Sequence, residues 1–547
     1  MDASAVFVRI HDELLEAIRS ATPVDIATGL AILLALRISF RVVRNKLKTT
    51  RLRGPPRKSL IFGWSLNLLE AEDAGSMYEE WAREYGAVYE VPTTLGGRRI
   101  MLCDPRAIAH FYSKETWTYL QTDFDLLHTR KHFGKAILSA QGQDHKRQRK
   151  SLSPAFSQAA TRKLLPVFYN SAYKAKTAWE TLIDANDGRG AVIEVQNWMN
   201  HVSLDTIGLA GFSHDFCSLD GKSSRVAEIF DTFATLSLNF PLFLFTQVFP
   251  MLLHVPTAAG DLFGDMNHTL TGVSKKFLER SKEEKEAGII DGKDDKSIIG
   301  VLVKAKDAGA DIQLSIEEII AQIKLFIAAG YETTSVSMTW ALLELARNPD
   351  IQTKLRAELL AFGSDPTYDQ LTNSLPYLDA VVHETLRLYP PLAEFIRQAR
   401  EDDIIPLSEP VRTRSGRVVN SISVTRGTQI GISAACINRS AALWGADSKV
   451  FRPERWLEEG GIPQKAKEVQ GYRHLLTFVD GPRTCLGKGF AVAEFKAVMV
   501  VLIKGFVFEM RDGPHTQIEM GRGLLPRPRV VGEDGTKLPL RVSRYEG

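Results

Sequence analysis

The longest apolar helix that the sequence predicts lies between Ser315 and Asn348. Ser315 and Glu318 have the spacing of a capping box, which satisfies free amide groups at the start of a helix. Asn348 is followed by Pro349, which ends one. Apolar residues occupy most of the circumference in between. We therefore expect this helix to run through the core of a large helical body.

One turn of this helix contains residues that an apolar core does not favour. In AGYETT (residues 329–334), the glycine costs about 1 kcal/mol relative to alanine, and a buried carboxylate needs a partner. In a purely structural interpretation, the Thr333 hydroxyl bonds back to the Ala329 carbonyl group and Glu332 reaches solvent. In the alternative interpretation, this turn belongs to a functional site.

The rest of the chain predicts a mainly α fold with a minor β-sheet region. Residues 404–432 alternate between apolar and polar types and are interrupted by proline and glycine, which is typical of short strands. The charged, glycine-containing segment 282–296 indicates an exposed connector rather than a domain boundary. Of the 547 residues, 44% are hydrophobic, which is enough to fill one large core. We expect a single catalytic domain over residues 51–547.

Residues 1–50 are predicted to form a membrane anchor with a basic flank. The apolar run of residues 23–36 is followed by basic residues from Arg37 to Arg53, an asymmetry that favours a cytosolic position for the following domain. The run is shorter than the roughly 20 residues of a spanning helix, and Asp25 interrupts it. The segment is expected either to span the membrane or to lie in its surface; a loosely packed terminal helix is the alternative. No small-residue cleavage site follows, which disfavours a removed signal peptide.

Charge and cysteine content argue against two classes of protein. Lys and Arg (68) nearly balance Asp and Glu (65), so there is no basic excess of the kind that nucleic-acid-binding proteins carry. The cysteines are scattered and form no CxxC pair, which argues against a disulfide framework and for a reducing compartment. They are Cys103, Cys217, Cys436 and Cys485.

A second predicted helix carries a candidate ion pair. Glu384 and Arg387 lie one turn apart in VVHETLRLYPPL, flanked by valine and leucine. An exposed pair of this kind contributes little, whereas a buried pair needs further partners to offset desolvation. Arg455, in FRPERW, is a candidate for the second guanidinium group. We expect the three side chains to form a buried network with a structural role.

Cys485 lies in TFVDGPRTCLGKGFA (residues 477–491), just before an apolar helix whose free amides and dipole favour a thiolate. A redox role would require a second cysteine nearby, zinc would require more Cys or His ligands, and a nucleophile would require a base, for which His474 is the candidate. The interpretation that remains is an axial ligand of an iron macrocycle. Gly481 and Gly487 would then let the backbone approach the ring, and Arg483 would face an anionic group.

The pattern Phe478-x-x-Gly481-x-Arg483-x-Cys485-x-Gly487 resembles the haem-binding loop of cytochrome P450 monooxygenases. AGxETT, ExxR and PERW occur in the same order as in that family, and the resemblance covers the chain from about residue 30 onward. It implies the cytochrome P450 fold, haem b with Cys485 as its axial ligand, and insertion of one oxygen atom from dioxygen into a substrate C–H bond. Electrons are expected from NADPH through a separate reductase, because no glycine-rich nucleotide-binding fingerprint occurs.

The resemblance also implies roles for individual residues. Glu332 and Thr333 are similar to the acid and alcohol pair that organises proton delivery to dioxygen, while Ala329 and Gly330 open the helix groove in which dioxygen sits. Glu384, Arg387 and Arg455 resemble the structural triad behind the haem. The expected partners of the haem propionates are Arg483, Arg397, Arg149 and His145, where His145 stands at a position at which the family often has Trp. A basic docking face for the reductase is expected from Lys488, Lys496, Arg147 and Lys150.

Substrate and location are expected from analogy. The pocket walls should come from residues 120–140, 235–255, 326–329, 393–396 and 521–525, whose apolar composition favours a lipophilic substrate such as a terpenoid, a steroid or a fatty chain. Residues 235–255 are also candidates for contact with the membrane surface. The sequence, including GQDHKRQRK (residues 142–150) and the long carboxyl-terminal loop, resembles fungal members of the family that act in secondary metabolism at the endoplasmic reticulum membrane. The alternatives are a haem-thiolate isomerase or dehydratase, a non-catalytic membrane-anchored haem-binding protein, and a cysteine hydrolase.

Overall fold

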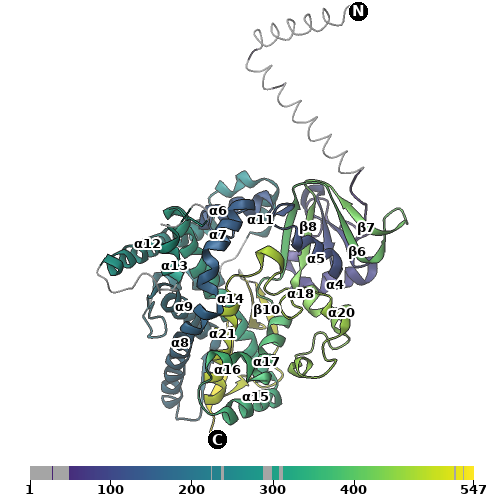
Figure 1. Cartoon of the computed structure of the whole chain (residues 1–547). Coiled ribbons are helices and arrows are strands. Elements are labelled where there is room, and N and C mark those ends of the chain that lie inside the picture. Colours follow the sequence, from purple (N-terminus) through teal and green to yellow (C-terminus); the bar gives the residue numbers. More distant parts are fainter. Residues whose placement is uncertain are drawn as a thin grey trace, which may run out of the picture.

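The computed structural model describes residues 48–222, 224–235, 239–286, 298–306, 309, 312–522, 525–533 and 535–547, together with Thr22 and Thr28. In these parts, helices form most of the molecule, and the largest sheet lies to one side (Figure 1). The predicted mainly α fold with a minor β-sheet region is therefore confirmed. The longer helices are α4 Ala74–Tyr85, α6 Asp123–Phe133, α7 Gly142–Leu152, α8 Gln158–Asp184, α9 Val195–Phe212, α10 Arg225–Thr235, α12 Ala258–Glu286, α14 Ile316–Arg347, α15 Pro349–Phe362, α17 Pro376–Leu388 and α21 Lys488–Gly505. The shorter ones are α3 Ser65–Glu70, α5 Pro105–Ser113, α11 Phe240–Val248, α13 Ile298–Lys306, α16 Tyr368–Asn373, α18 Ala434–Arg439, α19 Ala441–Trp444 and α20 Gln464–Lys467.

The largest sheet has the strand order β1-β2-β8-β5-β3, in which only β2 and β8 are parallel neighbours. Three smaller sheets pair β6 with β7, β10 with β11, and β12 with both β4 and β9. The strands expected in residues 404–432 are present as β6 Asp403–Arg412, β7 Val418–Val424 and β8 Gln429–Ser433, whereas the others lie outside the predicted region. Those others are β1 Val88–Pro92, β2 Arg98–Leu102, β3 Tyr119–Leu120, β4 Ala191–Glu194, β5 Glu394–Ala399, β9 Phe506–Met510, β10 Ile518–Arg522, β11 Pro526–Val530 and β12 Pro539–Arg544.

The predicted central helix is α14, which passes through the middle of the molecule (Figure 1). The Ser315 hydroxyl accepts the Glu318 amide hydrogen and the Glu318 carboxylate accepts that of Ser315, so the capping box is present. Most of the helix is buried, and its largest contact is with α9. Gly330 is required by this contact, because a Cβ atom there would lie 2.9 Å from Cγ1 of Ile207 on α9.

The predicted membrane anchor lies almost wholly outside the described residues, since only Thr22 and Thr28 are described before residue 48. Among the helices that the structure does describe, none combines the length and the apolar character that crossing a membrane requires. The proline-containing segment that follows lies beside β1: the Arg53 carbonyl accepts the Glu90 amide hydrogen, and the Trp64 indole donates to the Pro56 carbonyl at 2.8 Å.

The structure brings Glu384, Arg387 and Arg455 together in one buried network. Arg387 donates from Nε and Nη2 to the two carboxylate oxygens of Glu384, each at 2.8 Å, and Nε of Arg455 lies 3.5 Å from the same carboxylate. Trp456 donates to Glu384 at 3.0 Å, and Asp447 pairs with Arg455 at 3.1 Å. The remaining Arg387 protons go to the carbonyl groups of Asn438, Ser448 and Val450. The network therefore ties α17 to the long segment before the Cys485 loop.

Glu384→Gln is expected to lower the free energy of unfolding by about 3–5 kcal/mol, because it leaves two buried guanidinium groups without their central counter-charge. Urea unfolding followed by circular dichroism measures the change. Glu409→Gln is the matched control: Glu409 pairs with Lys465 on the surface, where such a pair is worth about 1 kcal/mol or less. Equal destabilisation by the two substitutions would contradict the structural role of Glu384.

Candidate functional site

The loop that carries Cys485 is closed by hydrogen bonds of its own backbone. The Cys485 amide donates to the Phe478 carbonyl at 2.8 Å, and the Thr484 hydroxyl donates to the same carbonyl at 3.2 Å. Gly481 has φ +68°, and a Cβ atom there would lie 2.6 Å from the Tyr112 carbonyl oxygen of α5, so a side chain is excluded. Gly487 is the N-cap of α21, and a Cβ atom there would meet the Phe156 ring at an ordinary contact distance of 3.8 Å, so crowding within the protein does not explain this glycine.

The Cys485 side chain is accessible although the residue lies deep in the protein. Burial raises the pKa of its thiol, whereas the amides of Gly487 and Lys488 and the charge of Arg149 lower it. The expected effect of the helix terminus is present, but in the protein alone it is smaller than the effect of burial. A metal ion on the sulfur would reverse this balance, because coordination deprotonates a thiol.

His474 does not support the interpretation of Cys485 as a nucleophile. Its Nδ1 atom lies 3.2 Å from the carbonyl oxygen of Val469. No hydrogen bond joins it to Cys485 among the described residues. The base that a cysteine hydrolase requires is therefore not placed beside the sulfur.

Arg483, Arg397 and Arg149, expected from three separate segments, meet beside the Cys485 loop. Arg397 on β5 donates to the Glu115 carboxylate at 2.7 Å, and Arg483 donates to the Ala140 carbonyl at 2.8 Å. Arg149 on α7 donates to the Thr484 carbonyl at 2.5 Å, which places it next to the sulfur. Burial lowers the pKa of Arg483 to about 10; Glu115 opposes this shift, and the other two guanidinium groups add to it.

His145 lies in the same cluster and is buried. Burial, together with the charges of Arg483 and Arg149, lowers its pKa to about 3, so the imidazole is neutral at physiological pH. Its Nδ1 atom has no hydrogen-bond partner, and neither do the buried Tyr112 hydroxyl and the Gln141 side-chain amide nitrogen in this described region. His145 can therefore donate one hydrogen bond but adds no positive charge.

These residues fit a group with two carboxylates. Of the three guanidinium groups, that of Arg397 bonds the Glu115 carboxylate, whereas those of Arg483 and Arg149 bond backbone carbonyl groups, and buried donors around them are unpaired. Buried polar groups without partners are rare in proteins, so an anionic group with several acceptor oxygens is the natural complement. Haem, with its two propionates and an axial position for a thiolate, matches this donor set. Glu115 is not predicted from the sequence, because it belongs to no pattern and is recognised only by its contact with Arg397.

On α14 the purely structural interpretation of AGYETT is confirmed for Thr333 and wrong for Glu332. The Thr333 hydroxyl donates to the Ala329 carbonyl at 2.7 Å, as that interpretation predicts. Glu332 does not reach solvent: its side chain is 5% exposed and accepts a hydrogen bond from Arg527 on β11 at 2.7 Å. Ala329 is exposed and Thr333 half-buried although the helix around them is buried, so this pair of residues marks the accessible stretch of α14. Gly330, expected to open a groove, is instead packed against Ile207.

A cavity of about 580 Å³ lies elsewhere, between the largest sheet, the start of α6 and the end of α11. It touches two of the expected wall segments, at residues 122–124 and at residues 247–250, and many of its lining side chains are polar. It contains none of the predicted haem or proton-delivery residues. It is therefore separate from the site beside Cys485.

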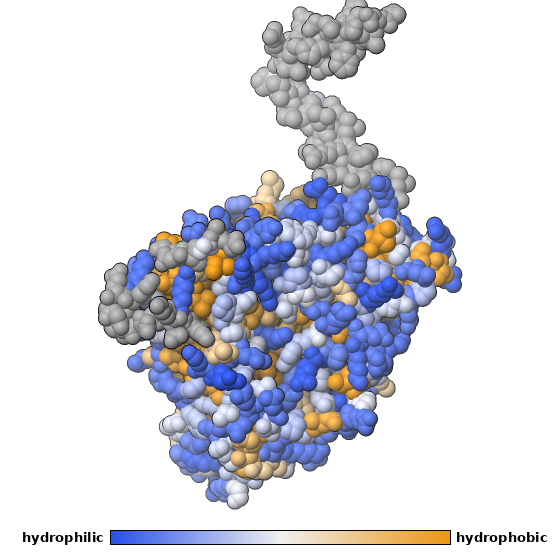
Figure 2. Space-filling view, viewed as in Figure 1, coloured by the Kyte–Doolittle hydropathy of each residue, from blue (hydrophilic) through white to orange (hydrophobic). Residues whose placement is uncertain are grey.

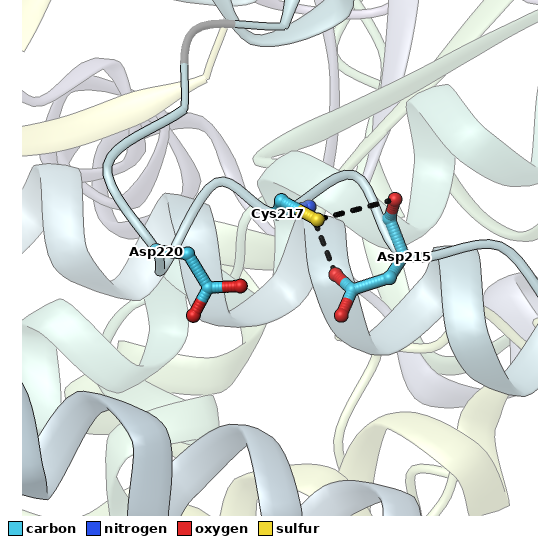
Figure 3. A group of neighbouring side chains, drawn as sticks. All are labelled: Asp215, Cys217 and Asp220. Carbon is cyan, nitrogen blue, oxygen red and sulfur yellow. Dashed lines mark hydrogen bonds between the residues drawn. The ribbon is translucent and has the colours of Figure 1, made fainter.

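A further cluster, Asp215, Cys217 and Asp220, has ligand atoms close enough together for a metal ion (Figure 3). It lies in the loop after α9, and Asp215 accepts a hydrogen bond from the Cys217 amide. Lys174 of α8 already pairs with both carboxylates, at 2.9 and 3.4 Å. The hydrogen bond to Asp215 raises the pKa of Lys174, so an ammonium group supplies the positive charge here.

The expected docking face is only partly present. Lys496 is buried and donates to Asp379 at 2.6 Å, and Arg147 pairs with Glu318. Lys496 is therefore held inside the protein, and the half-buried Arg147 already has a partner of opposite charge. Lys488 and the exposed Lys150 retain the expected position. The ammonium group of Lys488 lies 4.7 Å from the centre of the Tyr472 ring.

Comparison with known proteins identifies the family of the chain. The family model for cytochrome P450 matches residues 53–531. The chain is 53% identical to cytochrome P450 monooxygenase claP of Ampulloclitocybe clavipes, over 92% of this chain and 95% of the relative, and 49% identical to claW of the same fungus, over 97% and 99%. It is 34% identical to cytochrome P450 monooxygenase 128 of Postia placenta, over 90% and 92%. The chain therefore belongs to the cytochrome P450 family, which implies a haem cofactor and an oxidoreductase of the monooxygenase type.

Proposed function

We propose that the protein inserts one oxygen atom from dioxygen into a lipophilic small molecule, the other oxygen leaving as water. The electrons come from NADPH through a separate reductase. The observation that carries this proposal is Cys485, placed on a closed loop beside three guanidinium groups in a chain of the cytochrome P450 family. Haem b is the proposed cofactor.

The contacts of the individual side chains support the following proposed roles. Haem, when bound, supplies the activation of dioxygen that amino-acid side chains lack. Cys485 would ligate its iron, and Arg483, Arg397, Arg149 and the neutral His145 would hold its propionates. The Thr333 hydroxyl, on the accessible stretch of α14, would orient protons toward dioxygen. Glu332 is the nearest acid in the sequence, and its contact with Arg527 is the feature that any account of proton delivery must include.

The alternative functions are less well supported. A haem-thiolate isomerase or dehydratase does not need an acid and an alcohol at the oxygen-binding stretch of α14, and this chain has both. A non-catalytic haem-binding protein would need neither. The relatives named above are monooxygenases by name.

A lipophilic substrate is favoured by the apolar side chains in the proposed wall segments. Phe326, Phe395 and Leu525 come from three of these segments and are all nearly buried members of the main core cluster. A pocket bounded by such residues selects its ligand by apolar contact and shape. A terpenoid or another secondary metabolite is our proposed substrate class, and the fungal origin of the relatives agrees with it.

The absorption difference spectrum of the reduced protein with carbon monoxide tests the haem ligation. The unmodified protein is expected to give a strongly red-shifted Soret band. Cys485→Ser should abolish that band, because a hydroxyl group does not replace the thiolate. Cys217→Ser, at a cysteine far from the loop in sequence, is the matched control and should keep it. A red-shifted band that survives Cys485→Ser would overturn the assignment, and oxidation of candidate lipophilic substrates with NADPH and a reductase then tests turnover.

Arg149→Gln is expected to speed the loss of haem about tenfold or more, because a hydrogen bond between charged groups contributes about 1.5–3 kcal/mol. Transfer of haem to apomyoglobin, followed by absorbance, gives the rate. Lys150→Gln removes one positive charge from the exposed neighbouring position of α7 and should leave the rate unchanged. Equal rates for both variants would remove Arg149 from the propionate site.

We also propose that the catalytic domain rests on the cytosolic face of the endoplasmic reticulum membrane. Hydrophilic residues cover most of the face in Figure 2, with apolar residues in separate patches. One set of exposed apolar residues, the apolar rim, joins the loop before α3 to the end of α11: Leu95 donates its amide hydrogen to the Ile61 carbonyl, and the rings of Phe62 and Phe245 lie 5.6 Å apart. The rim consists of Leu60, Ile61, Leu95, Val248, Phe249, Met251 and Val255. A rim of this kind suits contact with a lipid surface.

Met251→Trp in the full chain tests this contact. Met251 is 75% exposed, and a tryptophan there should be quenched by vesicles of phosphatidylcholine with brominated acyl chains. Leu457→Trp is the control, because Leu457 is 45% exposed but is not part of the rim. No gain in quenching for Met251→Trp over Leu457→Trp would exclude the rim from the membrane.

A further inference from the structure

Two of the four cysteines lie together where two neighbouring strands of the largest sheet end. The Sγ atoms of Cys103 and Cys436 are 4.0 Å apart, although the residues are separated by 333 positions in the chain. Cys103 follows β2 directly, and Cys436 is the third residue of α18, which continues from β8. Because β2 and β8 are parallel neighbours, their carboxyl ends lie at the same end of the sheet. The fold therefore pairs two thiols that the sequence shows as isolated residues.

The two sulfur atoms differ in their access to solvent. Cys436 is 2% exposed and belongs to a core cluster that includes Trp81 and Met101. Cys103 packs against the same cluster but is only half-buried. The Cys436 amide donates to the Ser433 hydroxyl at 3.1 Å, which fixes Cys436 at the start of α18. A small oxidant in solution therefore reaches Cys103 first, and Cys436 stands behind it at a defined position.

The groups that face Cys436 keep it in the thiol form. Its hydrogen bond with Cys103 and its burial raise its pKa, and the charge of Glu79 on α4 adds to this shift, whereas Arg439 of α18 opposes it. A protonated thiol reacts slowly with peroxide, since the thiolate is the nucleophile. Cys436 is therefore protected from direct oxidation and is held in reserve beside Cys103.

We propose that Cys103 and Cys436 are a peroxide-sensitive thiol pair, which closes to a disulfide that locks α18 to the largest sheet. In the first step, the Cys103 sulfur bonds to one oxygen of hydrogen peroxide, the O–O bond breaks, and the thiol proton leaves with the other oxygen as water. In the second step, the Cys436 sulfur attacks the sulfenic acid at Cys103, the S–O bond breaks, and the Cys436 proton leaves with the hydroxyl group as water. The two thiols lose two electrons, which one molecule of peroxide gains.

The movement that this step requires is small. A disulfide bond is about 2.05 Å long, so the two sulfur atoms have to approach each other by about 2 Å. Each Sγ atom moves on a circle around its own Cα–Cβ bond. Because Cys103 is only half-buried, its side chain has room to turn, and the backbone ends of β2 and β8 stay in place.

The helix that carries Cys436 also holds the segment before the Cys485 loop. The side-chain amide of Asn438, on α18, donates to the Thr477 hydroxyl and accepts the Leu476 amide hydrogen, each at 2.9 Å. Asn438 lies two residues after Cys436. A disulfide at Cys436 would therefore fix this segment to the sheet through α18.

Mass spectrometry of the full chain after brief treatment with hydrogen peroxide tests the cross-link. Free thiols are blocked with iodoacetamide, and the digest is compared with and without reduction. We expect the disulfide between Cys103 and Cys436 to be about tenfold or more abundant than any other cysteine pair, because these two sulfur atoms are already in contact. Absence of this disulfide at a peroxide concentration that oxidises Cys217, which is also half-buried, would overturn the proposal.

Cys436→Ala separates the roles of the two sulfur atoms. Without its partner, Cys103 should be oxidised further, to sulfinic and sulfonic acid, which reduction does not reverse. Cys103→Ser should leave Cys436 unoxidised, and it serves if Cys436→Ala fails to fold. Cys217→Ala is the matched control, because the Cys217 thiol donates to the Asp215 carbonyl and not to a second thiol; it should leave the disulfide unchanged. Equal overoxidation of Cys103 with and without Cys436 would overturn the proposal.

The temperature of unfolding, followed by circular dichroism, tests the lock. Peroxide treatment should raise it by about 2–5 °C, because a disulfide across so long a stretch of chain restricts the unfolded state. Dithiothreitol should reverse the rise, and Cys103→Ser should not show it. Cross-linked protein that unfolds at the original temperature would overturn the lock. These measurements need no turnover, so a missing red-shifted Soret band would reject the proposed function without affecting their result.

Discussion

The burial of α14 is the constraint on which the rest of the structure depends. Its residues are apolar on most sides, so other helices and the β10–β11 hairpin must surround it, and each polar group on it must find a partner inside the protein. The Thr333 hydroxyl donates to a carbonyl group of its own helix, and the Glu332 carboxylate pairs with Arg527. Between the exposed ends of the helix, the short stretch at Ala329 and Thr333 stays accessible and is consequently available to a ligand.

Two clusters rich in arginine show how a structural site differs from a binding site. In the Glu384 network, carboxylates and backbone carbonyl groups accept the hydrogen bonds of both guanidinium groups. Beside Cys485, one of the three guanidinium groups bonds a carboxylate, that of Glu115, and buried donors nearby have no partner. The first cluster is complete by itself, which explains why it holds a shape. The second has an excess of positive charge and of donors, which fits an anionic group such as the haem propionates.

Prediction from the sequence succeeded where the signal was local. The capping box and the proline fixed the ends of α14, and alternation identified β6 to β8. The strands β4 and β12 were missed because their pairing joins residue 191 to residue 542, and no local pattern contains that information. Lys496 was taken for a surface residue because its charge was read without its partner; in the fold it lies on the buried side of α21 and binds Asp379.

The sequence by itself determined the family and the order of the polar motifs, and it predicted Cys485 as the ligand, because these depend on residue types at short spacings. The tertiary structure decided which groups these side chains contact. Three features depend on contacts between segments that are distant in the chain: whether Glu332 reaches solvent, whether Cys485 is more affected by burial or by nearby amides, and which guanidinium group pairs with Glu115. Such contacts form only when the apolar surfaces pack, and for that reason Glu115 and Arg527 carry no signal in the sequence but occupy central positions in the structure.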